Sequence, residues 1–155
     1  SASGFGQTGP LKELPAYDMV VQGMGGLMSV TGQPNSEPTR VGTSIGDITA
    51  GLFTTIGINA ALYDRQKTGK GMYIDVSMLD CQIAILENAI ARYLSKNEIP
   101  KPMGSRHPSI APFEAFKTKD SHIIIAAGND KLFEKLCNLL NISELAKDSK
   151  FSNNS

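Results

Sequence analysis

The sequence lacks tryptophan, has only two cysteines and carries no net charge, and each absence narrows what the protein can be. The 15 Lys and Arg residues balance 15 Asp and Glu residues. Because no excess of cations is available to neutralise phosphates, we expect no nucleic-acid partner. No unbroken apolar run approaches the roughly 18 residues that cross a bilayer, so we expect no membrane partner either.

The few residues that could bind metal are scattered. Cys81 and Cys137 lie far apart and match neither a disulfide framework nor a metal-ligand spacing. His107 and His122 have no neighbouring Cys, His or acidic pair. We therefore expect no metal site. His122 should lie at the surface, and the two thiols should be reduced and buried. Cys81 lies on the apolar stripe of its predicted helix and is interpreted as a core residue rather than as a nucleophile.

What is present describes a folded protein. The 155 residues are 41% hydrophobic and 19% charged, which is enough apolar content to form a core. This length suits one domain or pieces of two. Neither end has the features of a natural terminus, so we expect an internal piece of a longer protein. The 15 glycines indicate tight turns and an α/β or α+β architecture.

Hydrophobic periodicity predicts the elements. Apolar residues at spacings of three and four predict helices at 17–30, 47–67 and 77–96. The helix at 47–67 is apolar nearly all round, which predicts that it is buried. Strands are predicted at 72–76, 113–117 and 122–127, the last two as a hairpin, followed by a helix that Asn129 and Asp130 cap. Residues 97–112, rich in Pro, Ser and basic side chains, predict a crossing between domains at 1–97 and 98–155.

A glycine-rich segment opens the chain. Gly4-Phe5-Gly6-Gln7-Thr8-Gly9 matches the dinucleotide-binding pattern G-x-G-x-x-G. That pattern requires a helix to begin within it, and Pro10 and Pro15 prevent one. We therefore favour a tight multi-glycine turn over a nucleotide site.

Among the carboxylates, Asp47 is the strongest candidate for a chemical role. It stands at the predicted start of a long helix, beside Gly46 and Gly51. One interpretation is structural, because Asp is a favoured N-cap. The other is functional: the helix N-terminus keeps a carboxylate ionised and oriented, and such a carboxylate can act as a covalent nucleophile. Position alone favours the cap.

A polar loop lies between the two regions. Gly104 permits unusual dihedrals, and Ser105, Arg106 and His107 supply hydrogen-bond donors. The loop is either a solvated linker or a lid at the junction of two domains. In the second case Arg106 could hold a carboxylate through two hydrogen bonds.

Several strings, in order along the chain, resemble the family III CoA-transferases. They are Gly4 to Pro10, Tyr17-Asp18, Gly25 to Met28 with Thr31-Gly32, Gly46-Asp47, Arg65 to Gly71 followed by Ile74 to Ser77, His107 to Phe113, and Ala127 to Asp130. This group includes formyl-CoA, carnitine-CoA and dicarboxylate CoA-transferases, with the α-methylacyl-CoA racemases as relatives. Each string alone is weak, but the ordered set is specific.

The resemblance implies an α/β fold: residues 1–97 belong to the central part of a large Rossmann-like domain with long helices, and residues 98–155 form a linker and the start of a small α+β domain. Two ring-shaped subunits would interlock as a homodimer. It also implies acyl-CoA and carboxylic acid substrates and no cofactor beyond the coenzyme A thioester. We expect a cytoplasmic location, or the mitochondrial matrix in a eukaryote.

The resemblance also implies site residues. Asp47 matches the catalytic aspartate, and Leu14, Pro15, Ala16 and Tyr17 match part of the CoA site. Gly104, Ser105, Arg106 and His107 match a mobile glycine-rich loop, although this loop holds only one glycine, which puts its gating role in doubt.

Three functions follow as alternatives. The first is CoA transfer through a covalent aspartyl intermediate on Asp47. The second is an isomerase of the racemase type, which has a histidine where this chain has Tyr17. A tyrosine, whose ordinary pKa is near 10, is a poor base at neutral pH, so we favour transfer. The third is a non-catalytic piece of the fold, since the isolated chain could be inactive.

Overall fold

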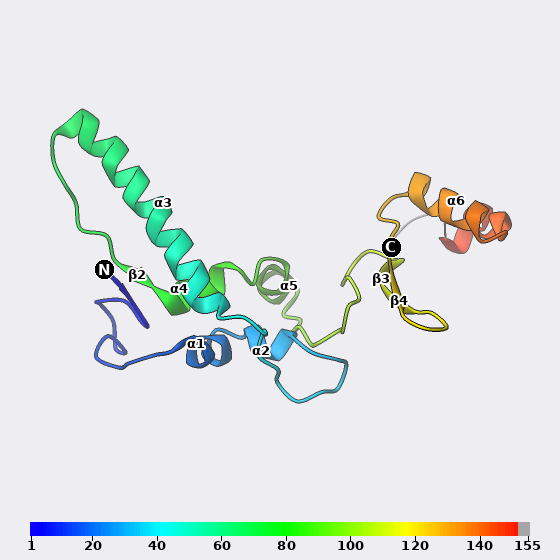
Figure 1. Cartoon of the computed structure of the whole chain (residues 1–155), viewed down its shortest axis with the longest axis horizontal. Helices are drawn as coiled ribbons and strands as arrows, with labels where there is room; N and C mark the ends of the chain where they lie inside the picture. Colours follow the sequence, from blue (N-terminus) through cyan, green and yellow to red (C-terminus); the bar gives the residue numbers. More distant parts are fainter. Residues whose placement is uncertain (152–155) are drawn as a thin grey trace. The chain divides into compact units, whose positions relative to one another are not determined.

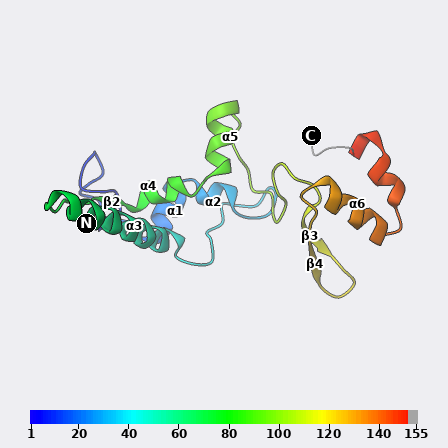
Figure 2. The ribbon, with the colours of Figure 1, turned by 90° about the horizontal axis from the view of Figure 1, so that it is seen from above.

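The computed structural model describes residues 1–151. The chain divides into two compact units, Ser1–Pro102 and Met103–Ser155. The first unit holds helices and a short strand pair, and the second holds a hairpin followed by a helix (Figures 1 and 2). This mixture of helices and strands confirms the α/β class. The predicted domain division after residue 97 concerns the intact protein and stays a prediction.

A two-residue parallel pair anchors the start of the chain. Strand β1 (Ala2–Ser3) pairs with β2 (Val76–Ser77), with Ala2 opposite Val76 and Ser3 opposite Ser77. The Ser1 amino group donates a hydrogen bond to the Ile74 carbonyl at 2.8 Å. The predicted strand at 72–76 is therefore wrong except for Val76, because β1 offers only two residues for pairing.

The predicted helix at 17–30 is broken in two. Helix α1 runs over Asp18–Met24 and α2 over Leu27–Val30. Gly26 between them has φ of 85°, a left-handed conformation that ends a helix. Gly25 lies against Gln82, since a Cβ on Gly25 would lie 2.6 Å from Cγ of Gln82. The missing side chain at Gly25 therefore permits this close approach.

Helix α3 (Ile45–Thr68) confirms the predicted helix at 47–67 and extends it at both ends. It stops at Gly69, whose left-handed backbone (φ 69°) lets its N–H bond the Arg65 carbonyl. Only Gly46, Thr49 and Ala50 are buried. The prediction that the whole helix is buried is wrong for this chain, because residues 1–151 cover only its first turns.

By length and composition α3 could also cross a membrane. An 18-residue window has mean hydropathy 1.3, and 17% of that window is buried. The sequence analysis missed this helix because it considered unbroken apolar runs. Glycine, threonine and asparagine interrupt the apolar sequence of α3 without adding charge. Such a helix is weak evidence for a membrane protein, since core helices of soluble proteins pass the same test.

The predicted helix at 77–96 is also broken. Helix α4 spans Met78–Ala84 and α5 spans Asn88–Lys96. Glu87 has φ of 44°, which an α-helix cannot accommodate. Ser77 caps α4, its Oγ accepting a hydrogen bond from the Asp80 N–H at 3.2 Å.

The core of the first unit lies where α1, α3, α4 and β2 meet. Ala50, Val76 and Cys81 are buried together, with Ile74 and Met78 packed against them. The core position of Cys81 is confirmed. The first turns of α3 are thus held from two sides, and this fixes where its N-terminus stands.

The second unit begins with the predicted hairpin. Strands β3 (Phe113–Lys117) and β4 (His122–Ala126) pair antiparallel, with Phe113 opposite Ala126, and His122 is exposed as expected. Helix α6 (Asp130–Leu139) follows, and Oδ1 of its cap Asn129 accepts from the Leu132 N–H at 3.0 Å. Two 3-10 turns, η1 (Ser143–Lys147) and η2 (Ser149–Phe151), end the described chain.

Candidate functional site

Asp47 lies in the first turn of α3, with an exposed side chain. The N-cap is Ser44, and its side chain makes no capping hydrogen bond. The cap interpretation of Asp47 is therefore wrong, because the helix begins two residues earlier than the sequence pattern predicts. The terminal amides still favour a negative charge in this turn. What remains is an accessible anion at a helix N-terminus.

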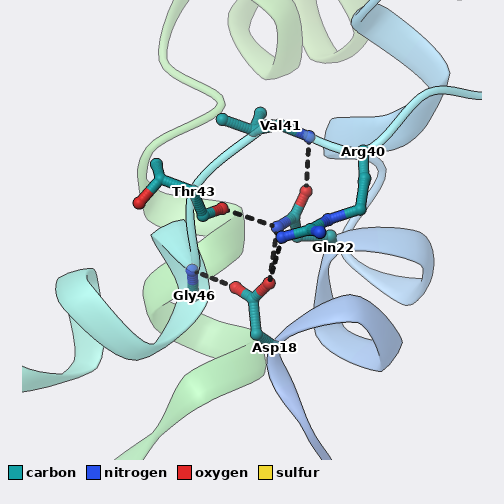
Figure 3. Close-up of polar contacts among 6 residues, drawn as sticks. All are labelled: Asp18, Gln22, Arg40, Val41, Thr43 and Gly46. Carbon is teal, nitrogen blue, oxygen red and sulfur yellow. Dashed lines mark hydrogen bonds and ion pairs between the residues drawn. The ribbon is translucent and has the colours of Figure 1, made fainter.

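The residue before Asp47 is held from beneath by a buried carboxylate (Figure 3). Asp18, the first residue of α1, is 8% exposed, and its Oδ1 accepts a hydrogen bond from the Gly46 N–H at 2.8 Å. A Cβ on Gly46 would lie 2.8 Å from Cγ2 of Val21 and 3.1 Å from the same Asp18 oxygen. Only glycine lets α3 approach α1 this closely.

A second buried side chain on α1 completes the cluster. Gln22 is wholly buried, and its Nε2 donates to Oδ2 of Asp18 at 2.7 Å and to the Thr43 carbonyl at 3.4 Å. Its Oε1 accepts from the Val41 N–H at 2.9 Å. Figure 3 shows the Asp18 carboxylate and the Gln22 amide, which together hydrogen-bond the backbone segment that leads into α3.

Arg40 adds a positive charge to the cluster. Its Nη2 lies 3.9 Å from Oδ2 of Asp18, and its side chain is about half exposed. A buried carboxylate is costly unless hydrogen bonds and an opposite charge compensate it, and Asp18 has both. The sequence analysis missed Asp18, Gln22 and Arg40 as a unit. The available signal was the i, i+4 spacing of Asp18 and Gln22 on a helix.

A third helix brings a buried amide to the same place. Gln82 on α4 is wholly buried, and within residues 1–151 neither its Oε1 nor its Nε2 has a hydrogen-bond partner. Its Oε1 would lie 3.6 Å from a Cβ on Gly46. Gln22 and Gln82 are therefore two buried amides beside the start of α3, one fully bonded and one not.

The predicted CoA residues form one accessible stretch just before Asp18. Leu14 and Tyr17 are 55% and 83% exposed, Pro15 is exposed and Ala16 is half-buried. Tyr17 is the N-cap residue of α1. This stretch and the Asp18 cluster are therefore continuous in the chain, while the CoA-binding role itself stays a prediction.

The opening glycine segment is a turn. Gly6 and Gly9 have φ of 79° and 86°, and no helix begins between residues 4 and 16. The Gln7 N–H donates to Oδ2 of Asp75 at 2.7 Å. The Asp75 carboxylate therefore already occupies this backbone donor, and the predicted glycine turn is confirmed.

In the second unit, the loop at 104–107 is fixed to β3. The Ala115 N–H donates to Oγ of Ser105 at 3.0 Å, and the His107 N–H donates to the Phe113 carbonyl at 2.9 Å. Gly104 takes φ of 65°. Arg106, between these two anchors, lines a cavity of about 600 Å³ together with Phe116, Asn129, Phe133 and other residues. The role of this loop toward Asp47, which lies in the other unit, stays a prediction.

Residues 1–151 give no support to two other kinds of catalytic site, a metal cluster and a reactive thiol. No group of three or more His, Cys, Asp or Glu side chains there could hold a metal ion. Burial, and then the nearby charge of Asp80, raise the pKa of the Cys81 thiol above its ordinary value. A thiol that stays protonated is a poor nucleophile. Asp47 is thus the accessible nucleophilic group beside the buried cluster.

Fold and site together define a partial α/β domain that presents a carboxylate at the start of a long helix. The family model described as CoA-transferase family III matches residues 1–155, and the chain belongs to this family. The expected family is confirmed.

The chain is 48% identical to acetyl-CoA:oxalate CoA-transferase of Acetobacter aceti over 155 residues, which cover 99% of this chain and 40% of that protein. It is 41% identical to human succinyl-CoA:glutarate CoA-transferase over 154 residues, covering 99% of this chain and 35% of that protein. The crystal structure of a CAIB/BAIF family protein from Brucella suis matches with a TM-score of 0.80 at 47% identity, covering 100% of this chain and 41% of that one. The chain thus spans between 35% and 41% of the length of these relatives.

Proposed function

We propose that the intact protein transfers coenzyme A between an acyl-CoA and a carboxylic acid, with Asp47 as the covalent nucleophile. Membership of CoA-transferase family III supports the reaction class. The observation that carries the residue assignment is the position of Asp47: an exposed carboxylate in the first turn of α3, on backbone that Asp18 and Gln22 hold in place.

The chemistry balances with the carboxylate alone. An Asp47 oxygen attacks the thioester carbonyl, the C–S bond breaks, and a mixed anhydride and CoA thiolate form. The thiolate then attacks the Asp47 carbonyl, which gives an aspartyl-CoA thioester and releases the donor acid. The acceptor carboxylate attacks that thioester, its C–S bond breaks, and a second mixed anhydride and CoA thiolate form. The thiolate then attacks the acceptor carbonyl of this anhydride, which gives the new acyl-CoA and frees the Asp47 carboxylate. No electron changes hands and no net proton moves, so the mechanism uses no cofactor.

The helix N-terminus suits this sequence of steps. It stabilises Asp47 as an anion before attack and again when each acid departs. Splitting one transfer into covalent steps lets groups of similar energy exchange. Relatives named for oxalate, succinate and glutarate make dicarboxylic acids the first acceptors to test.

Further parts of the proposal concern the intact protein. Leu14 to Tyr17 would contact CoA, which their exposure supports. The protein would be an interlocked homodimer in the cytoplasm or the mitochondrial matrix. Large apolar side chains on α3 are exposed in this chain, including Leu52 at 59% and Ile56 at 62%, and they support association with further protein surface.

Mass spectrometry of the intact protein tests the assignment. It is mixed with succinyl-CoA without an acceptor acid, digested and searched for a CoA or acyl adduct. We expect the adduct on the peptide that contains Asp47, and none in Asp47→Asn. An adduct on another residue, with none on Asp47, would overturn the nucleophile assignment.

A further inference from the structure

The backbone that leads into α3 is held at three points from one face of α1. Gln22 bonds the Val41 N–H and the Thr43 carbonyl, at 2.9 and 3.4 Å. Asp18 bonds the Gly46 N–H at 2.8 Å. Gln22 also bonds Asp18 at 2.7 Å, so the two side chains act as one unit (Figure 3).

Packing against α4 and β2 also holds the first turns of α3, but within residues 1–151 the side-chain hydrogen bonds that reach residues 41–46 from outside α3 come from Asp18 and Gln22. The N-cap Ser44 gives no side-chain capping bond, although such a bond commonly sets where a helix begins. Ser44 itself is exposed. The place of Asp47 therefore depends on the two α1 side chains, which act on residues 41–46 through the backbone.

We propose that Gln22 is a positioning residue for the reaction: it fixes residues 41–43 and orients Asp18, and so sets where the Asp47 carboxylate stands. The proposal rests on the proposed function of Asp47. Gln22 is wholly buried, so it touches no substrate and acts only through the backbone. A displacement of about 1 Å at a reacting group lowers a rate by about a hundredfold, which makes such support measurable.

Gln82 supplies a matched control. It is the same residue type, equally buried, and lies beside the same glycine, but its amide has no hydrogen-bond partner within residues 1–151. Gln22→Met and Gln82→Met remove the same atoms from the same kind of surroundings. Only the first removes hydrogen bonds to the segment before α3.

The two variants are compared in the intact protein by steady-state exchange of CoA from succinyl-CoA to a dicarboxylic acid. We expect Gln22→Met to lower kcat by about tenfold to a hundredfold with KM for both substrates nearly unchanged. Gln82→Met should keep kcat within about threefold. An equal fall in both variants, or an unchanged kcat in Gln22→Met, would overturn the proposal.

A swap of the two polar groups tests the hydrogen bonds rather than the packing. In the double variant Asp18→Asn with Gln22→Glu, the new amide can donate to the new carboxylate. Its oxygen can still accept from Gly46, and the carboxylate can still accept from Val41. The bond to the Thr43 carbonyl is not restored, because a carboxylate has no hydrogen to donate, so the recovery should be partial. We expect each single variant to lose activity and the double variant to recover at least tenfold over Gln22→Glu. A double variant no better than the worse single one would contradict the proposal, even if Gln22→Met failed to fold.

Hydrogen exchange gives a readout that needs no activity. Amides of residues 41–48 should exchange at least tenfold faster in Gln22→Met than in Gln82→Met. Equal exchange in the two variants would overturn the positioning role. If the proposed function were wrong, Asp47→Asn would keep CoA transfer activity. The hydrogen-exchange comparison of the two glutamine variants does not depend on that activity, so the two failures can be told apart.

Discussion

Asp18 accepts a hydrogen bond from the Gly46 N–H at 2.8 Å, although the two residues are 28 positions apart in the sequence. The bond ties the first residue of α1 to the residue that precedes Asp47. It also explains the glycine, because any side chain at 46 would collide with Val21 and crowd that oxygen.

The first prediction follows from this contact. Gly46→Ala would place a Cβ 2.8 Å from Cγ2 of Val21, closer than real Cβ contacts come. We expect the intact protein to lose about 1–3 kcal/mol of stability, because a packed core has to shift. CoA exchange should fall at least tenfold, since α3 must move away from α1. Thermal unfolding and exchange assays measure the two effects.

Gly51→Ala on the same helix is the control. A Cβ at Gly51 meets nothing within 4 Å, so alanine should raise helix stability by up to about 1 kcal/mol. Similar losses in both variants would show that the Asp18 contact has no special role.

A second prediction separates the chemical role of the Asp47 carboxylate from its contribution to stability. Asp47→Asn removes the nucleophile but no hydrogen bond seen within residues 1–151. Exchange should become undetectable, while stability falls by no more than about 1 kcal/mol through the lost helix-dipole interaction. Exchange near the wild-type rate would contradict the proposed mechanism, whatever the change in stability.

A third prediction concerns stability alone. The buried amide of Gln82 has no partner within residues 1–151, and an unsatisfied buried polar group costs about 1–3 kcal/mol. Gln82→Met should therefore raise the free energy of unfolding by about 1 kcal/mol. A loss of similar size would show that a bound water or another segment of the intact protein satisfies this amide.

The local pattern of the chain predicted much of the fold. Periodicity found α3, the hairpin of β3 and β4, and the cap of α6 at Asn129. It failed at Gly26 and Glu87, where a single positive φ divides a continuous apolar pattern into two helices. Such breaks depend on contacts with other helices, like that of Gly25 with Gln82, which no single segment reveals.

The site was predicted only in part, because it too depends on contacts between segments far apart in the sequence. Asp47 stood out because a helix start favours an anion, yet the sequence could not show whether it capped the helix. Asp18 and Gln22 acquire their roles only when α1 packs under residues 41–46. That contact is long-range, and its only local trace is the spacing of two polar side chains on an otherwise apolar helix.

A fourth prediction separates transfer from isomerisation. The family resemblance matches Tyr17 to a position that holds a histidine in the racemase relatives, so this chain would lack the imidazole that serves as their acid–base partner. In heavy water, a 2-methylacyl-CoA should gain deuterium at its α-carbon no faster with the intact protein than with Asp47→Asn. Rapid incorporation without an acceptor acid would move the assignment to the isomerase.

The last prediction concerns Arg106. Its side chain lines a cavity of about 600 Å³, between backbone anchors at Ser105 and His107. No ion pair occupies its guanidinium within residues 1–151, so it is available to hold a carboxylate by two hydrogen bonds.

We expect Arg106→Ala to raise KM for the acceptor acid by about tenfold to a hundredfold, equivalent to about 1.5–3 kcal/mol for a lost charged hydrogen bond. KM for the acyl-CoA should change less. Lys119→Ala, in the exposed hairpin turn, removes the same charge away from the cavity and should leave both values unchanged. Equal kinetics of Arg106→Ala and the wild type for every acid would make the loop a linker, because a lid that binds acid cannot lose its only arginine without cost.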